Sequence, residues 1–392
     1  MDQKTIEGYK ELFSRELHGN ILPFWLKHGL DGKYGGYYTG LDREGKLIES
    51  DKSVWFQGRF SWILSTAYLG NPERKEYLKA AESGIRFLTD HCFDSRGRMY
   101  YRTDEAGKPL LQRRYYFSEL FAVNAFAAFA RASGNREYIT RARDLLALVE
   151  ELAEESVPEN PKWIPGGRDS TSLGYPMIKI SVLQELRRAD RSREEEYSRK
   201  IRKCIDDILP AHLVSDQKCL VENICGGKPS FDHNEGRQLN PGHAIELSWF
   251  ILLEYNETGD RQLLDWGRQI FDWMWQWGWD SEYGGLFYFR DALDHPSSDY
   301  WHDMKFWWPH NEAVIASLLL FQLTGERAYW EKFEQVLGWT LEHFPDREYG
   351  EWFGYLHRDG SVSSTVKGNM FKGPFHIPRM FLLCGDIFKD LE

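Results

Sequence analysis

Two kinds of helical segment alternate along the chain. One kind is apolar on nearly all sides, as in WFQGRFSWILSTAY from Trp55 and PGHAIELSWFILLEY from Pro241. The other, as in KEYLKAAESGIRFL, carries a single apolar stripe, made of Tyr77, Leu78, Ala81, Ile85 and Leu88. Glycine-containing stretches such as ASGN, ETGD and LTGE stand between the two kinds and indicate a helix end followed by a helix start. The all-round apolar helices are expected inside the fold, and the striped helices outside them.

A short motif precedes the apolar segments: an Asp, a glycine turn, and alternating aromatic residues. Its copies begin at Asp31 (DGKYGGYYTG), Asp94 (DSRGRMYYRT), Asp280 (DSEYGGLFYF) and Asp346 (DREYGEWFGYL), with weaker copies near Asp216 and Lys162. A glycine turn flanked by alternating residues is typical of a short β-hairpin. The pattern therefore predicts six units, each with a hairpin, an interior helix and an outer helix.

Six such helical hairpins can close into an inner ring of six helices wrapped by an outer ring of six. This predicts an all-α fold, an (α/α)6 barrel, with its short β-hairpins gathered at the active-site end. Residues 1–392 would then form a single catalytic domain. An open solenoid of twelve helices is the alternative for the same repeat pattern.

The overall composition argues against several classes of function. The 392 residues carry a formal net charge of −11, whereas nucleic-acid binding calls for basic patches. No apolar run approaches the ~20 residues of a membrane span, and the N-terminal segment lacks the apolar stretch of a signal peptide. The five cysteines show no CxxC spacing, so we expect reduced thiols and a cytoplasmic protein.

One aligned position, at the junction between hairpin and interior helix, carries mostly ionisable residues. The residues aligned there are Arg59, Glu119, Met177, His243, His310 and His376. Because all six junctions should open at one end of the barrel, these side chains are predicted to surround one cavity. His243 and Glu246 are three residues apart and so share a helix face.

Most of these candidates also have a structural interpretation. His310, in WWPHNE, can be a buried histidine that satisfies the backbone around it. Glu246 is either a substrate ligand or the salt-bridge partner of an arginine. Glu312 is either a sugar ligand or the partner of Arg59 or Arg379. The chain has 16 Trp, and Trp55, Trp307 and Trp308 either stack on a sugar or fill the barrel.

Other ligand chemistries find little support in the sequence. There is no phosphate loop, dinucleotide fingerprint or HExxH motif. A metal set is conceivable from His243, Glu246, Glu312 and His376, but no spacing demands one, and we expect none. The remaining histidines are expected in helix ends or loops, in solvent (His18, His28, His91, His212, His295, His343 and His357) or in hairpin loops near the mouth (His233 and His302).

Four motifs resemble those of the N-acylglucosamine 2-epimerase family. They are WFQGRFSW, LNPGHAIELSWF, KFWWPHNEA and EWFGYLHRDG…KGNMFKGPFHIPR, and they occur in order along the whole chain. The family fold is an (α/α)6 barrel, in agreement with the repeat pattern. The resemblance implies the interconversion of N-acetylglucosamine and N-acetylmannosamine, with no cofactor needed for the chemistry.

Residue roles follow from the matched motifs. His243 and His376 resemble the acid/base pair, supported by Arg59, Glu246 and Glu312 as further catalytic residues. Arg379, Trp308, Trp55 and His310 are the candidate substrate-binding residues. Imidazoles suit the removal and return of a C2 proton, by way of an enediolate, because their pKa of ~6.5 lies near operating pH. Relatives acting on neutral sugars carry a histidine where this chain has Met177, which favours the N-acyl branch.

The resemblance implies further properties and leaves alternatives open. It implies a homodimer, a place in sialic acid metabolism, and ATP as an activator that is not hydrolysed. The loop VPENPKWIPGGRD offers Lys162 and Arg168 for phosphates, or is an ordinary surface loop. Alternative activities are a cellobiose 2-epimerase, a mannose-type aldose–ketose isomerase, a glycoside hydrolase using Glu246 and Glu312 as its carboxylate pair, and a non-catalytic sugar-binding protein.

Overall fold

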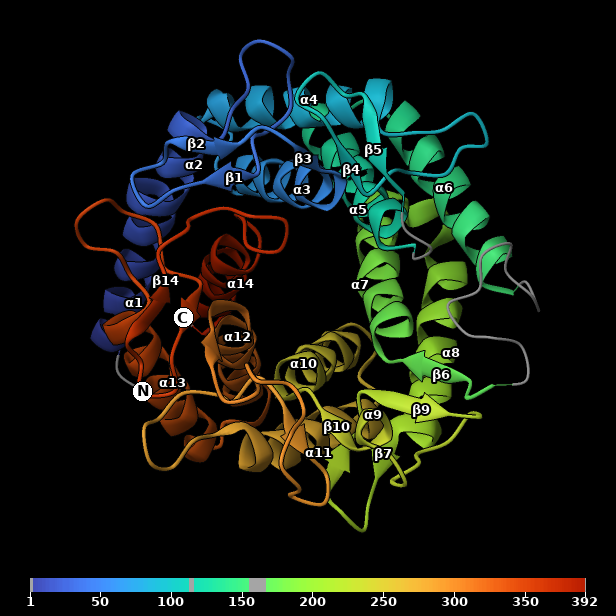
Figure 1. The fold of residues 1–392 in the computed structure, drawn as a ribbon, viewed down its shortest axis with the longest axis vertical. Helices are drawn as coiled ribbons and strands as arrows, with labels where there is room; N and C mark the ends of the chain where they lie inside the picture. The colour runs from blue at the N-terminus through green and yellow to red at the C-terminus, as the bar shows by residue number, and fades with distance from the viewer. Residues whose placement is uncertain (1–2, 113–115, 155–166, 392) are drawn as a thin grey trace.

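The computed structural model describes residues 3–112, 116–154 and 167–391, and they form two concentric rings of helices (Figure 1). Within the described residues the inner ring has six helices. These are α3 (Val54–Gly70), α5 (Phe117–Ser133), α7 (Gly174–Ala189), α10 (Pro241–Thr258), α12 (Trp307–Thr324) and α14 (His376–Asp390). Each inner helix contacts the next along the chain, and α14 contacts α3, so the ring is closed.

The outer ring is built from the helices that alternate with these. It comprises α1 (Gln3–Glu16), η1 (Leu17–Ile21) and α2 (Leu22–His28), then α4 (Lys75–His91), α6 (Glu137–Glu154), α8 (Glu194–His212), α11 (Arg261–Gly278) and α13 (Arg327–His343). Two short helices, η2 (Arg191–Arg193) and α9 (Asn234–Arg237), lie in connections. Helix α1 packs on α14, so the first and last helices complete the sixth pair. This closure excludes the open solenoid and supports the single-domain organisation, which stays a prediction.

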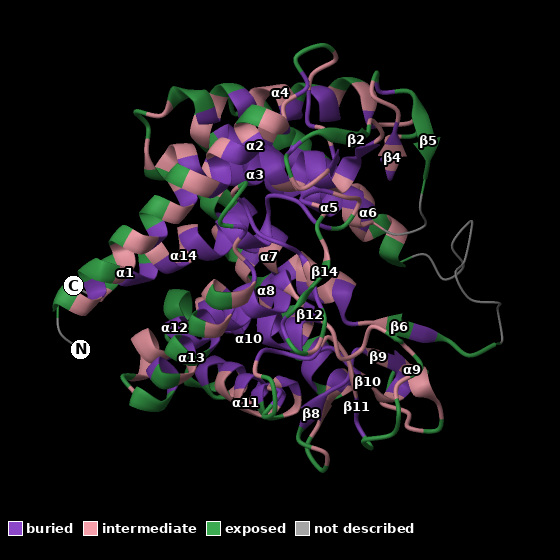
Figure 2. Ribbon diagram, turned by 60° about the vertical axis from the view of Figure 1, so that its left-hand side comes forward, coloured by how far each residue is buried: buried purple, intermediate pink, exposed green. Residues whose placement is uncertain are grey.

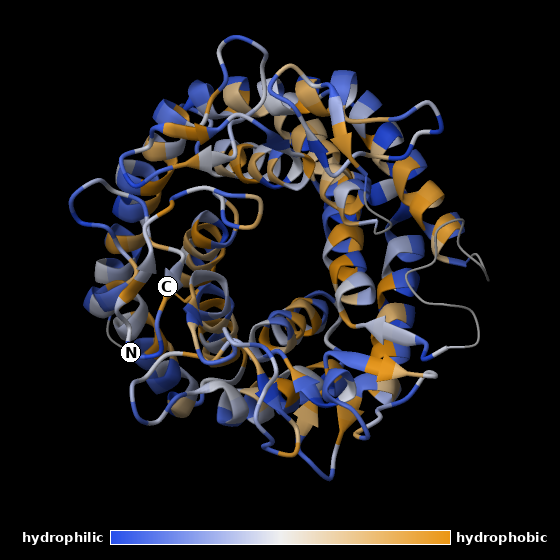
Figure 3. Ribbon diagram, viewed as in Figure 1, coloured by the Kyte–Doolittle hydropathy of each residue, from blue (hydrophilic) through white to orange (hydrophobic). Residues whose placement is uncertain are grey.

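Burial separates the two rings as the hydrophobic pattern predicts. Every residue of α12 from Trp307 to Leu320 is buried, whereas α11 buries one stripe that includes Leu263, Ile270 and Met274. Figure 2 shows the inner helices mostly as buried, and Figure 3 shows polar and apolar residues alternating along the outer helices. No helix of the described residues is long and apolar enough to cross a membrane.

The predicted helix ends are confirmed at the glycines. Gly259 and Gly325 follow α10 and α12 with φ of 73° and 70°, in the left-handed region, and each donates its N–H back to the last turn. Only glycine adopts this conformation without a steric penalty, so these residues end the inner helices and turn the chain outward.

Short antiparallel strands gather at the end of the barrel where the inner helices begin. In the described part of the chain they form six small sheets: β1 (Gly40–Leu41) with β2 (Leu47–Glu49); β3 (Lys52–Ser53), β4 (Arg102–Thr103) and β5 (Pro109–Leu111); β6 (Ser170–Ser172) with β9 (Asn223–Cys225); β7 (Leu213–Val214) with β8 (Cys219–Leu220); β10 (Gln238–Leu239) with β11 (Arg290–Asp291); and β12 (Lys305–Phe306), β13 (Tyr355–Leu356) and β14 (Val362–Ser364).

The strand pairing corrects one detail of the predicted hairpins. The glycine motifs themselves are turns closed by single bridges, namely Leu30 with Tyr37, Phe93 with Met99, Trp279 with Leu286, and Pro345 with Trp352. The strand before an inner helix often pairs with the next unit, as β3 does with β4 and β12 with β13. The sheets therefore tie neighbouring units together. The weak copy near Lys162 lies largely outside the described residues.

Buried lysine–aspartate pairs anchor three of the glycine motifs. Lys52 lies 2.7 Å from Asp31, Lys305 lies 3.0 Å from Asp280, and Lys367 lies 2.9 Å from Asp346. All six side chains are almost fully buried, where an ion pair is screened little by water. These pairs hold the Asp of the motif to the strand or loop that precedes the inner helix of its unit.

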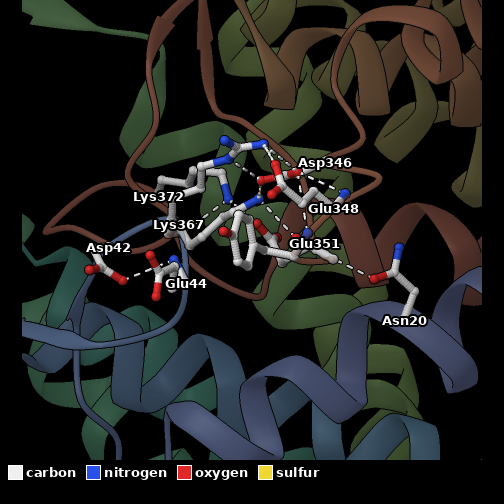
Figure 4. Close-up of polar contacts among 11 residues, drawn as sticks. Asn20, Asp42, Glu44, Asp346, Glu348, Glu351, Lys367 and Lys372 are labelled. Carbon is white, nitrogen blue, oxygen red and sulfur yellow. Dashed lines mark hydrogen bonds and ion pairs between the residues drawn. The ribbon is translucent and has the colours of Figure 1, made fainter.

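The last unit carries the densest of these networks (Figure 4). Asp346 accepts from Lys367 and, through two hydrogen bonds, from Arg43 of the first unit. Lys372 pairs with Glu351 and is fully buried. The network joins the first and last units of the chain. It also fixes the loop that leads into α14, whose first residue is His376.

Candidate active site

A cavity of about 510 Å³ opens at the strand end of the barrel. Aromatic and aliphatic side chains make up most of its wall. The ionisable residues in the wall are Arg59, His243, Glu246, His376 and Arg379, with the phenol groups of Tyr288 and Tyr355. An apolar cavity of this size with a few converging polar groups is the usual form of a site for a small ligand.

The aligned junction residues do not all reach this cavity. Arg59, Met177, His243 and His376 line it, whereas Glu119 and His310 do not. Glu119 is fully buried and accepts hydrogen bonds from Arg98 Nε at 2.9 Å and from the backbone N–H of Met99 at 3.0 Å.

His310 corrects the prediction of a substrate-binding role. Its Nε2 accepts from the backbone N–H of Leu286 at 2.8 Å, and its Nδ1 donates to the carbonyl of Phe306 at 2.6 Å. The ring is fully buried, and burial, opposed by the Phe306 carbonyl, lowers the pKa of His310 to about 3. His310 is therefore a neutral residue with both nitrogens used, in line with its structural interpretation.

A hydrogen bond that recurs in three units explains why the repeat alignment wrongly placed Arg59 with Glu119 and His310. Gln57 Oε1 accepts from Tyr37 N at 2.8 Å in the first unit, as Glu119 does from Met99 N and His310 does from Leu286 N. In each case an inner-helix side chain holds the second bridge residue of a glycine motif. The residue equivalent to Glu119 and His310 is thus Gln57 and not Arg59, which lies two residues further along α3.

His243 lies in the first turn of α10. Asn240 caps this helix by accepting from the His243 N–H at 3.1 Å. The Nδ1 atom of His243 is 3.0 Å from Glu222 Oε2, so the proton on Nδ1 points to that carboxylate and Nε2 is left for the cavity. Burial lowers the pKa of His243, but the Glu222 carboxylate outweighs it, and the pKa lies above its ordinary value.

His376 begins α14 and has a carboxylate of its own. Its Nδ1 lies 2.8 Å from Glu312 Oε1, while Nη2 of Arg379 lies 2.7 Å from that same oxygen. Glu312 is fully buried and also accepts from Trp249 Nε1 at 2.9 Å. Burial and the Arg379 cation hold the pKa of His376 well below its ordinary value, although the charge of Glu246 opposes them.

The ring of Trp308 contacts the rings of both histidines. Its ring centroid is 4.9 Å from that of His243 and 5.6 Å from that of His376, and all three rings line the cavity. Two imidazoles on different inner helices, each with Nδ1 on its own carboxylate, thus face one space. Within the described residues, neither Nε2 has a hydrogen-bond partner.

Arg59 presents a charge without an ion-pair partner. Its guanidinium carbon lies 4.0 Å from the ring centroid of Phe121 and 4.9 Å from that of Phe375, and no carboxylate of the described residues forms a salt bridge with it. Burial, opposed by the charge of Glu246, lowers the pKa of Arg59 to about 10, so the side chain stays charged at neutral pH. An unpaired buried cation at a cavity wall favours an anionic group in that cavity.

Arg379 links the two other acids. It binds Glu246, which lines the cavity, and Glu312, which lies behind it, so Glu312 is the arginine partner that its second interpretation proposed. Glu246, Glu312 and His376 have ligand atoms close enough together to hold a metal ion. The guanidinium of Arg379 already supplies a positive charge to both carboxylates, and the absence of a metal stays a prediction.

The other predicted residues differ in their placement. Trp55, Trp307 and Trp308 line the cavity. Arg168 is exposed beside β6 and does not line it, and Lys162 lies outside the described residues. His212, expected in solvent, is buried with Nδ1 on the carbonyl of Val221 at 2.9 Å. At the mouth, Trp301 lines the cavity in place of His302.

Sequence reasoning missed Glu222, Asn124 and Ser181. Glu222 stands between β8 and β9, where the repeat motif is weak. Its backbone N–H donates to the carbonyl of Gln238, in the strand before α10, and its carboxylate reaches Nδ1 of His243. Asn124 and Ser181 line the cavity from α5 and α7. A polar residue within an apolar inner helix is the signal that could have found Asn124.

Solved structures with the same fold include sugar-converting enzymes. The cellobiose 2-epimerase of Spirochaeta thermophila superposes with a TM-score of 0.86 at 24% identity, covering 99% of this chain and 98% of its own. A D-mannose isomerase superposes with a TM-score of 0.82 at 17% identity, covering 99% of this chain and 98% of its own. These likenesses confirm the predicted (α/α)6 barrel.

Sequence comparisons are more specific. The N-acylglucosamine 2-epimerase of Bos taurus is 34% identical over 100% of this chain and 93% of its own length, and that of Homo sapiens is 32% identical over 100% and 92%. A model of the family described as N-acylglucosamine 2-epimerase (GlcNAc 2-epimerase) matches residues 36–376. The match runs from the first glycine motif to His376, and the chain therefore belongs to the N-acylglucosamine 2-epimerase family.

Proposed function

We propose that this isomerase interconverts N-acetylglucosamine and N-acetylmannosamine by removing and returning the proton on C2 of the open-chain sugar. The observation that carries the proposal is the pair of imidazoles in one cavity. His243 and His376 come from different inner helices, and each keeps Nδ1 on a separate carboxylate while Nε2 is left for the ligand. Family membership supports the same activity.

The opposite pKa shifts of His376 and His243 indicate which histidine removes the proton and which one returns it. The lowered pKa of His376 favours its neutral form, and the raised pKa of His243 favours its protonated form. Nε2 of His376 takes the C2 proton, and the electron pair of the C–H bond moves into the C1–C2 bond as O1 becomes anionic. The result is an enolate, or an enediolate for a neutral sugar. His243 then gives its Nε2 proton to the opposite face of C2, and the carbonyl reforms.

Arg59 stabilises the charge that develops on O1. Its guanidinium has no carboxylate partner among the residues that the structure describes, and the surrounding aromatic rings exclude water. A fixed cation in such surroundings is worth more at the developing oxyanion than in water. After one turnover the proton lies on His376 and not on His243, so the reverse reaction uses the same pair with the roles exchanged.

A glycoside hydrolase is poorly supported by the site. It would need two carboxylates facing the scissile bond across open space. Glu312 does not line the cavity, and Arg379 binds both Glu312 and Glu246. Epimerisation of cellobiose and isomerisation of mannose remain the alternatives, because both begin with removal of the same proton.

The test is proton exchange at C2. The protein is incubated in D₂O with N-acetylmannosamine, mannose or cellobiose, with and without ATP, and C2 is followed by proton NMR. We expect deuterium at C2 of N-acetylmannosamine together with N-acetylglucosamine formation. Exchange with neutral sugars alone would replace the proposed substrate, and binding without any exchange would leave a sugar-binding protein.

Further properties are inferred from the family resemblance and from the sequence. We infer a cytoplasmic homodimer that acts on an amino sugar in sialic acid metabolism, without nucleic acid or membrane partners. ATP is inferred as an activator that is not hydrolysed, with Arg168 and Lys162 as the residues for its phosphates. The comparison with and without ATP in the exchange experiment tests the effector.

A further inference from the structure

Two residues in the wall of the cavity each carry a buried polar atom that has no hydrogen-bond partner among the described residues. Asn124, on α5, is only 7% exposed, and its Oδ1 is buried without a hydrogen-bond donor. Arg379, on α14, is 3% exposed, and its Nε is buried without an acceptor even though Nη2 is engaged. Both residues line the main cavity and also a small cavity of about 20 Å³ that shares part of its wall.

Such groups are costly when they stay unpaired. A buried donor or acceptor without a partner loses about 1–3 kcal/mol of hydrogen bonding. Two of them, of opposite type, on the same two cavities point to a ligand that both donates and accepts. Ser181, on α7, also lines both cavities and offers a hydroxyl.

The surroundings of these polar atoms are apolar. Met177 and Ile178 of α7, Phe121 of α5 and Phe250 of α10 line the cavity beside Asn124 and Ser181. A hydrated hydroxyl or a charged group would be poorly placed against these side chains. A small group with one N–H, one carbonyl and a short hydrocarbon end matches both the orphan atoms and the apolar wall.

We propose that Asn124, Arg379, Ser181 and Met177 form the subsite for the 2-acylamino group of the substrate. The amide N–H donates to Asn124 Oδ1, the acyl carbonyl accepts from Arg379 Nε and Ser181 Oγ, and the acyl methyl packs on Met177. The inference rests on the proposed function and deepens it, because it names the residues that select an N-acylated sugar.

The arrangement is consistent with the positions of the two histidines. His376 and Arg379 lie one turn apart on α14, so a C2 atom held at His376 Nε2 has its substituent within reach of Arg379. Anchoring the acyl group leaves C2 free to change configuration between His243 and His376. The subsite thereby holds the part of the substrate that is chemically unchanged in the reaction.

Binding of unreactive open-chain analogues tests the subsite independently of turnover. N-acetylglucosaminitol and glucitol differ at C2 only, and neither has the carbonyl needed for proton removal. Calorimetry with the wild-type protein is expected to show at least about 10-fold tighter binding of N-acetylglucosaminitol, on the scale of one or two buried hydrogen bonds. Equal affinities of the wild type would overturn the subsite.

Asn124→Leu is expected to reduce this preference to about 2-fold or less, since it removes the acceptor and keeps the volume. Asn124→Asp keeps an acceptor for the amide N–H and is expected to retain a preference. Asn311→Leu is the matched control: Asn311 is also buried with an unpaired Oδ1, but it lies on α12 and does not line the cavity.

The outcomes separate the two proposals. An Asn124→Leu protein that folds and keeps the full preference overturns the subsite, whatever the activity is. If that variant does not fold, the Met177→Ala variant replaces it. Relative to the wild type, its affinity for N-hexanoylglucosaminitol is expected to rise more than its affinity for glucitol. Equal rises in affinity overturn the subsite. If the wild type prefers the acylamino alditol but exchanges no C2 proton, the reaction is wrong and the subsite stands.

Discussion

The Nδ1 atom of His243 lies 3.0 Å from Oε2 of Glu222, and no arginine in the described part of the chain shares that carboxylate. At the second histidine the situation differs, because Glu312 binds Arg379 as well as His376. The unshared carboxylate raises the pKa of His243, whereas burial and the nearby cation lower that of His376. The pKa values of two residues of the same type are thus shifted in opposite directions.

Replacing Glu222 should alter the pH profile of kcat. The active state needs neutral His376 and protonated His243, so activity falls on the acid side as His376 gains a proton and on the alkaline side as His243 loses one. Glu222→Gln removes the negative charge but keeps an acceptor for Nδ1–H, so we expect the alkaline limb to move to lower pH while the acid limb stays.

Glu222→Asp is the control for this change, since it keeps the charge and should leave the alkaline limb closer to that of the wild type. NMR titration of the His243 ring checks the cause directly. An unchanged alkaline limb in Glu222→Gln would contradict the role of this carboxylate.

Arg59→Met should separate catalysis from stability. Removing a cation aimed at the oxyanion is expected to lower kcat/KM by about 10²–10³-fold. Because Arg59 has no ion-pair partner among the described residues, its loss leaves no carboxylate unpaired, and the free energy of unfolding should not fall. Urea unfolding and initial rates give the two quantities. Full activity with reduced stability would show that Arg59 is structural.

His310→Leu should lower stability and leave catalysis almost unchanged. It leaves the Leu286 N–H without its acceptor and removes the Nδ1 bond to the Phe306 carbonyl, and each lost hydrogen bond costs about 1–3 kcal/mol. We expect lower stability with kcat/KM within about 3-fold of wild type for the folded protein. His310→Gln should recover part of the stability, because Gln57 makes the equivalent bond to Tyr37 N. A large rise in KM for the sugar in His310→Gln would restore the substrate-binding role.

The buried Asp346 predicts a loss of stability in acid. Burial raises the pKa of this carboxyl, but Arg43 and Lys367 outweigh it, and the pKa lies below its ordinary value. The pair therefore stabilises the folded state above the unfolded pKa of ~3.9, and this contribution is lost as the pH falls below that value. Unfolding free energies measured at pH 7, 4 and 3 should decline accordingly.

Lys367→Met strands the Asp346 carboxylate next to Arg43 alone and should cost about 3–5 kcal/mol at pH 7. The double variant with Asp346→Asn should cost less than the sum of the two single changes. Additive costs, with no dependence on pH below 4, would mean that this ion pair contributes little.

The repeat pattern was sufficient to predict the rings, because each helix buries its own apolar surface and a left-handed glycine ends α5, α10 and α12. The histidines His243 and His376 lie in distinctive motifs, and both line the cavity. The repeat pattern could not predict which residue in the first turn of each inner helix faces the cavity. Residues of a helix turn by about 100° each, so a shift of two, from Gln57 to Arg59, exchanges a structural residue for a cavity residue.

Glu222 and the orphan atoms of Asn124 and Arg379 depend on contacts between units. Glu222 reaches His243 from a connection with no hydrophobic periodicity, and its backbone is held there by hydrogen bonds with Leu173 and Gln238. An unpaired buried atom is defined by what surrounds it in three dimensions, and a local sequence pattern does not contain that information.

Single-histidine variants in D₂O test whether the two histidines serve opposite faces of C2. His243→Asn and His376→Asn are each incubated separately with N-acetylglucosamine and with N-acetylmannosamine, and C2 deuteration and epimer conversion are followed by NMR. We expect conversion to fall by at least ~10²-fold in both, while each variant still exchanges the C2 proton of one epimer, a different one for each variant. Exchange of both epimers by one variant, or conversion close to wild type, would contradict the two-base account.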